Sequence, residues 1–143
     1  MNDRDRLIAR IGSLNDPDIP RPLVSLELFF AGNADRNSIG ESRSRKHSPQ
    51  VYFDLFRKLR SREDVADVLV EVTGIGTPDG WPTTDTIWVI TSLPLFPELQ
   101  RALPDGFIDI LPDDRLTFPR LDKRPTENID IPVGMTAWGF YYY

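Results

Sequence analysis

The chain has 143 residues, no cysteine, one histidine and a formal net charge of −5 at pH 7, with 40% apolar and 27% charged residues. These values are typical of one soluble globular domain with an ordinary hydrophobic core. They exclude disulfides, thiolate zinc sites, cysteine nucleophiles and any site built on paired histidines. We therefore expect no cofactor, no catalytic group and no metal site.

The first 16 residues predict a short helical appendage to a core that spans residues 23–143. Leu7, Ile8, Ile11 and Leu14 are spaced for one face of a helix. The N-terminus lacks an apolar segment of signal-peptide length, and no window approaches the roughly 18 apolar residues of a membrane span. We expect a cytoplasmic protein that does not enter a membrane.

The core begins with an alternating run and a long polar stretch. Residues 23–30 alternate apolar and polar side chains, which predicts a half-buried strand. Residues 31–48 are polar, and a loop of this length is usually functional or mobile. Ser48 and Pro49 then predict the start of a helix whose apolar residues include Leu55 and Phe56.

The second half predicts two paired strands, a helix and a final strand. The strands cover residues 67–73 and 86–92, and the turn-forming residues between them indicate an antiparallel hairpin with a long loop. A helix is expected near residues 94–103 and irregular packing over residues 104–132. The aromatic residues 135–143 predict the last strand.

The order of these elements matches the ferredoxin-like plan, βαββαβ. The predicted fold class is α+β, with a four-stranded antiparallel sheet, two helices on one face and the N-terminal helix added to it. If Val68, Val70 and Val72 meet the helices, Leu69 lies on the opposite face. The side chains expected beside Leu69 on that face are Glu71, Glu27, Trp88, Tyr141 and Tyr143.

The opposite face is either an open binding surface or a covered one. Aromatic and acidic side chains on an open face are typical of protein-binding hot spots. The alternative is that the N-terminal helix or residues 104–132 cover it, because large exposed apolar patches are uncommon on monomers.

Charge asymmetry indicates the kind of partner. Residues 61–114 carry eleven acidic and two basic side chains, a balance of −9, whereas residues 1–60 have a balance of +3. An acidic pole attracts cationic proteins and repels nucleic acid and anionic membranes. We expect a basic protein partner, no nucleic-acid binding and no membrane binding.

Several motifs are explained more simply by a structural role than by catalysis or ligand binding. The lone His47 and the basic residues at 43–46 are typical of a solvated loop. The glycines at positions 74–80 lack the helix that a phosphate-binding loop needs. Asp79 and Asp85 are more simply turn residues than a carboxylate pair for acid–base work or cation binding.

The runs LVSLELFFAGN at 23–33, SIG at 38–40, DVLVEV at 67–72 and WPTTDTIWVITS at 81–92 resemble a set of small bacterial proteins of uncharacterised function. The resemblance spans roughly residues 23–92 and the aromatic C-terminal strand. It implies a bacterial, cytoplasmic single domain and brings no established activity. By analogy of size and charge, such proteins include immunity proteins that neutralise a bacterial toxin.

The sequence thus leads to three hypotheses. The preferred one is a non-enzymatic protein-binding module, an immunity protein that covers a basic toxin or effector domain. A second is a small-ligand-binding protein or enzyme with a pocket under the 31–48 loop, using Asn33, Asp35, Asn37 and His47. A third is a homo-oligomeric structural protein joined through the C-terminal strand. The partner-binding residues expected under the first hypothesis are Glu71, Asp79, Trp81, Asp85, Trp88, Tyr141 and Tyr143.

Overall fold

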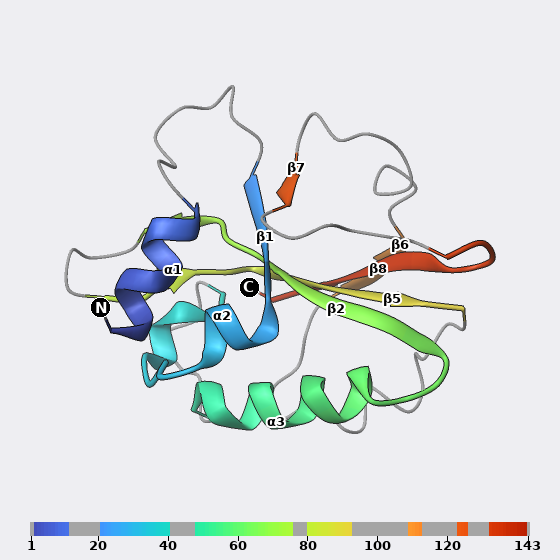
Figure 1. The fold of residues 1–143 in the computed structure, drawn as a ribbon, viewed down its shortest axis with the longest axis horizontal. Coiled ribbons are helices and arrows are strands. Elements are labelled where there is room, and N and C mark those ends of the chain that lie inside the picture. Colours follow the sequence, from blue (N-terminus) through green and yellow to red (C-terminus); the bar gives the residue numbers. More distant parts are fainter. Residues whose placement is uncertain are drawn as a thin grey trace.

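The computed structural model describes residues 2–11, 21–40, 48–75, 80–92, 109–112, 123–125 and 132–142. These residues form a mixed α+β fold in which helices pack on a twisted sheet (Figure 1). The elements in chain order are α1 Asp3–Ile11, β1 Arg21–Ser25, α2 Leu26–Phe30, the 3₁₀ helix η1 Arg36–Ser38, α3 Pro49–Arg60, β2 Val65–Glu71, β3 Gly74–Ile75, β4 Pro82–Thr83, β5 Thr86–Thr91, β6 Asp109–Pro112, β7 Lys123–Pro125 and β8 Thr136–Tyr141.

Helices α1 and α3 confirm two predictions. Leu7 and Ile11 bury one face of α1 in the main core. Ser48 precedes α3 with an extended backbone, and Pro49 occupies the first turn, where a missing N–H costs nothing. Within the described ranges, no helix is both long and apolar enough to cross a membrane.

The predicted strand over residues 23–30 is wrong in its second half. Strand β1 ends at Ser25, and residues 26–30 form the short helix α2. The Ser25 hydroxyl accepts a hydrogen bond from the Leu28 N–H at 3.1 Å, so this serine caps the helix. The buried face of α2 consists of Leu26, Phe29 and Phe30. Their i, i+3 and i+4 spacing fits a helix as well as the alternation fits a strand.

The ferredoxin-like plan is not confirmed, because the strand order differs. The main sheet has the order β6-β8-β5-β2-β1-β7. A strand-helix-strand unit of that plan would join parallel strands through the helix. Here β1 and β2 are antiparallel neighbours although α2, η1 and α3 lie between them in sequence. The four predicted strands are thus a meander of antiparallel neighbours, from β1 through β2 and β5 to β8.

The expected hairpin of β2 and β5 is present, with Val70 opposite Ile87 and Leu69 opposite Trp88. Strands β6 and β7 extend the sheet at its two edges. Both strands fall within residues 104–132, for which irregular packing was predicted. The prediction was therefore wrong at these two segments. Their lengths of four and three residues give little sequence signal. The helix predicted near residues 94–103 lies outside the described residues.

The two faces of the sheet carry separate apolar clusters, as the alternation predicted. Val68, Val70 and Val72 join the cluster that contains buried apolar side chains of the described helices α1, α2 and α3. Leu69 and Trp88 lie in the second cluster, and Tyr141 packs against it. Helix α1 belongs to the first cluster, so it does not cover the second one.

The position of β8 bears on the predicted oligomer. This strand pairs with β5 on one side and with β6 on the other. Over residues 138–141 both of its edges are therefore occupied, and this part of the strand offers no free edge to a second copy of the chain.

Candidate functional site

The predicted partner-binding surface contains a buried pair of residues. Glu71 is 2% exposed and Trp88 is 1% exposed, and the Trp88 Nε1–H donates a hydrogen bond to Glu71 Oε1 at 3.0 Å. A protein partner could not reach either side chain in this conformation. At these two residues the burial favours the covered alternative for this face over the open one, and both side chains pack the second face of the sheet.

Trp81 is also buried and ties two segments together. Its Nε1–H donates to the Phe29 carbonyl at 2.8 Å, and its backbone N–H donates to Asp35 Oδ2 at 3.1 Å. The side chain packs in the main core with the helices. Trp81 therefore anchors residues 80–85 to the end of α2 and to the turn that follows it.

The other predicted surface residues are placed differently. Asp85 is half-buried and its Oδ1 accepts a hydrogen bond from the Thr86 hydroxyl at 2.8 Å. Tyr141 is half-buried, with its ring edge-on to Trp88 at a centroid distance of 6.1 Å. Asp79 and Tyr143 lie outside the described residues.

The described acidic side chains of residues 61–75 and 80–92 do not gather at one place. Asp64 lies at the start of β2, where its carbonyl accepts the Ser92 N–H. Asp85 precedes β5 at the opposite end of the same strand pair, where its carbonyl accepts the Tyr142 N–H. Within the described ranges, the excess of negative charge is thus spread along the sheet.

The predicted polar pocket under the 31–48 loop is not assembled by the described part of that loop. Asn33 is buried; its amide donates to Ser38 Oγ at 3.0 Å and its carbonyl oxygen accepts the Asp35 N–H. Asp35 caps η1 by accepting the Asn37 N–H at 2.9 Å. These groups hold one another and Trp81, so they shape the loop. His47 lies outside the described residues.

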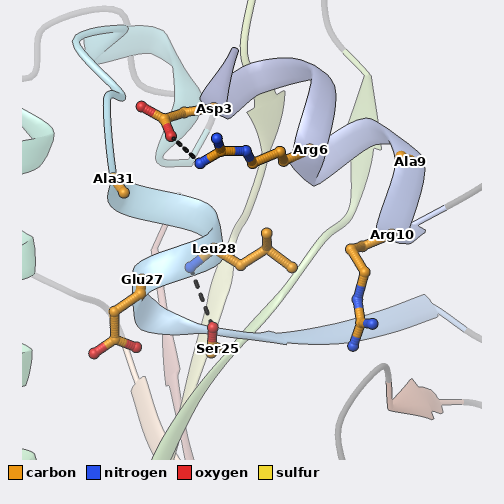
Figure 2. Close-up of a pocket in the computed structure, with 8 residues that line it drawn as sticks. All are labelled: Asp3, Arg6, Ala9, Arg10, Ser25, Glu27, Leu28 and Ala31. Carbon is orange, nitrogen blue, oxygen red and sulfur yellow. Dashed lines mark hydrogen bonds and ion pairs between the residues drawn. The ribbon is translucent and has the colours of Figure 1, made fainter. Parts of the chain in front are cut away.

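A groove lies instead between α1 and α2 (Figure 2). It has a volume of about 580 Å³, within the range of small-ligand sites. Its lining includes, from α1, Asp3, Arg6, Ala9 and Arg10, and, from the β1–α2 junction and α2, Ser25, Glu27, Leu28 and Ala31. Leu28 points into the space between the two helices in Figure 2.

The groove has an apolar floor and charged walls. Ala9, Leu28 and Ala31 supply the apolar surface. Arg6 donates to Asp3 at 3.4 Å, in a pair whose side chains are 63% and 47% exposed. Such exposed pairs contribute little stability, so both groups can exchange partners readily.

Across the groove, Glu27 is held by a residue of another helix. Both terminal nitrogens of Arg60 on α3 donate hydrogen bonds to the two carboxylate oxygens of Glu27. This hydrogen bonding lowers the pKa of Glu27 and raises that of Arg60. Asp67 on β2 lies near this ion pair. The pKa of Asp67 is raised, mainly because its carboxyl group is partly buried. The cluster joins α2, α3 and β2 at one edge of the groove.

The Glu27–Arg60 pair predicts a pH-dependent contribution to stability. Because the folded pKa of Glu27 is lowered, its contribution is present above its unfolded value of about 4.5 and is lost as the pH falls through the folded value. We expect Glu27→Gln to cost up to about 1 kcal/mol at pH 7, since the carboxylate is half exposed. Urea unfolding of both proteins at pH 7 and pH 3 should show a smaller difference at pH 3 than at pH 7.

Asp67→Asn provides a control with the opposite sign. Burial raises the pKa of Asp67, so its ionised form opposes folding at neutral pH. The asparagine variant should match or exceed the wild-type stability at pH 7, and any gain should vanish below pH 3.8. A Glu27→Gln cost that stays constant from pH 7 to pH 3 would contradict the assigned ion pair.

Sequence reasoning missed the groove because one of its walls, α2, was predicted as a strand. One signal was present in the other wall: Arg6 and Arg10 are four residues apart and therefore share a face of α1. The apolar partner of that face is set by the tertiary structure.

Comparison with known proteins identifies the family. Residues 2–138 match the model of the Uncharacterized protein YfbO family. The chain belongs to this family. It is 37% identical over 136 residues to the Uncharacterized protein YfbO of Escherichia coli (strain K12), a match that covers 93% of each chain. No solved structure matches.

Membership in this family confirms the resemblance to small uncharacterised bacterial proteins. The name of this family states no activity. Among the described residues, no group of three or more His, Asp or Glu side chains is placed to hold a metal ion.

Proposed function

We propose that this protein is a non-enzymatic binding protein whose ligand occupies the groove between α1 and α2. The observation that supports the proposal is the combination of an apolar floor and charged walls in a space of about 580 Å³. Ligand sites are typically concave and mostly apolar, with a few polar groups that orient the ligand. The site proposed here differs from the one expected under the 31–48 loop.

A side chain that fills the groove tests this proposal. Ala9 is exposed on α1 and lines the groove, so Ala9→Trp should block it with a change in stability below about 0.5 kcal/mol. We expect a thermal-shift screen of metabolites to give compounds that raise the melting temperature of the wild type by several degrees. The Ala9→Trp variant should lose this response.

Val51→Trp is the matched control for that screen. Val51 is an exposed apolar residue on α3, away from the residues that line the groove. The control variant should respond to the same compounds as the wild type does. Compounds that stabilise the wild type and the Ala9→Trp variant equally would place the binding site elsewhere.

A second candidate is the immunity protein, with a basic toxin or effector domain as partner. Membership in a bacterial family and the balance of −9 over residues 61–114 support it. Because Glu71, Trp81 and Trp88 are buried, its contacts would come from more exposed residues such as Glu63 and Asp85. The charge complementarity would mainly raise the association rate.

A comparative pull-down from the native bacterium tests the immunity role. The wild type should capture a basic protein at low salt and release it at high salt. The double variant Glu63→Lys with Asp85→Lys should capture markedly less of that protein. Equal capture by both baits would remove the acidic surface from the argument.

A further inference from the structure

We infer that the groove recognises an amphipathic carboxylate, a ligand with an apolar body of roughly ten carbons and one carboxylate group. This inference rests on the proposed ligand-binding role of the groove and adds the chemical class of the ligand. Three observations support it: the charged residues that line the groove, the contact between Arg60 and Glu27, and the length of the α1 wall.

The α1 wall of the groove is cationic. Arg6 and Arg10 both line it, one helical turn apart on the same face of α1. Figure 2 shows Arg6 reaching toward Asp3 and Ala31, and Arg10 reaching toward strand β1 at the other end of the helix. A guanidinium group presents planar donors that match the two oxygens of a carboxylate, so this wall suits such a group.

The carboxylates around the groove do little to repel an anion. Glu27 is engaged by Arg60 of α3, and in Figure 2 its carboxylate is turned away from α1. Asp3 forms a single exposed contact of 3.4 Å with Arg6. A ligand carboxylate could replace this contact at a cost below about 1 kcal/mol.

The floor of the groove suits an apolar chain of limited length. Ala9, Leu28 and Ala31 line the groove and carry no polar side-chain atom, and in Figure 2 Leu28 projects between the two helices. The α1 wall runs from Asp3 to Arg10, which is about 10 Å at 1.5 Å per residue. Covering such a floor with an alkyl chain removes apolar surface of both partners from water.

Calorimetric titration of the full chain with sodium decanoate, below its micelle concentration at pH 7, tests the inference. We expect saturable binding at one site. Decanol and decylammonium, which have the same chain without a negative charge, should bind at least tenfold more weakly. The double variant Arg6→Gln with Arg10→Gln should lose at least tenfold in decanoate affinity, with only a small change in thermal unfolding from the loss of exposed contacts.

A charge-matched variant, Arg36→Gln with Arg62→Gln, removes two exposed cations outside the groove and should bind decanoate as the wild type does. Decanoate and decanol binding equally, with no effect of the Arg6 and Arg10 changes, would overturn carboxylate recognition and leave the groove as a ligand site. Absence of saturable decanoate binding would overturn the inference. The proposed function is tested separately by the Ala9→Trp screen.

Discussion

Trp88→Ala should lower the free energy of unfolding by about 4 kcal/mol, with a fall of about 10 °C or more in the melting temperature. Trp88 is the largest fully buried side chain among the described residues and forms the centre of the second apolar cluster. Its ring also lies over Gly139 of β8, so closely that a Cβ atom there would be 2.8 Å from Trp88 Cζ3. The surroundings cannot close around the cavity without moving β5 against β8.

Trp88→Phe separates packing from hydrogen bonding. Phenylalanine keeps most of the ring area but has no Nε1–H for Glu71, so we expect a smaller loss of about 1 to 3 kcal/mol. Chemical denaturation monitored by far-ultraviolet circular dichroism measures both variants, and Val133→Ala in an exposed turn serves as a neutral control. A loss below about 1 kcal/mol for Trp88→Ala would contradict the description of this face as buried.

Glu71→Lys should destabilise the protein by about 3 kcal/mol or more, because it places a cation in a buried site shaped around a hydrogen-bonded carboxylate. Glu71→Gln retains an acceptor oxygen for the Trp88 Nε1–H and should cost about 1 kcal/mol. Denaturant midpoints and slopes for the two variants, measured side by side, give this difference.

Asp85→Lys is the matched charge reversal for the same experiment. Asp85 is half-buried beside the Thr86 hydroxyl, and we expect a cost below about 1 kcal/mol. If the Glu71→Lys variant is as stable as the wild type, the side chain at position 71 is accessible to solvent. A partner could then contact Glu71, as the first hypothesis predicts. If the expected order holds, any loss of partner binding in the Glu71→Lys variant has to be read as a loss of folding.

The sequence by itself was sufficient for properties that depend on local pattern. Periodicity located α3, placed most of β2 and β5, and assigned Val68 and Leu69 to opposite faces of the sheet. These assignments succeed because a helix and a strand each impose a fixed side-chain repeat on the sequence. The motifs quoted above likewise indicated a group of small uncharacterised bacterial proteins, and the family match confirms this.

Properties that depend on pairing between distant segments were decided only by the tertiary structure. Residues 26–30 satisfy a strand and a helix equally in pattern, and the Ser25 cap and the packing of Phe29 and Phe30 selected the helix. That choice made β1 short, placed it antiparallel to β2 and created the α2 wall of the groove.

Burial was the second property that the sequence left undetermined. An alternating strand has two faces, and its pattern does not say whether the second face meets water or another layer. Glu71 and Trp88 were correctly placed near each other on a face that the sequence left either open or covered, and the structure buries both with a hydrogen bond between them. Local periodicity therefore determined the direction of these side chains, while the folding of distant segments decided whether a partner could reach them.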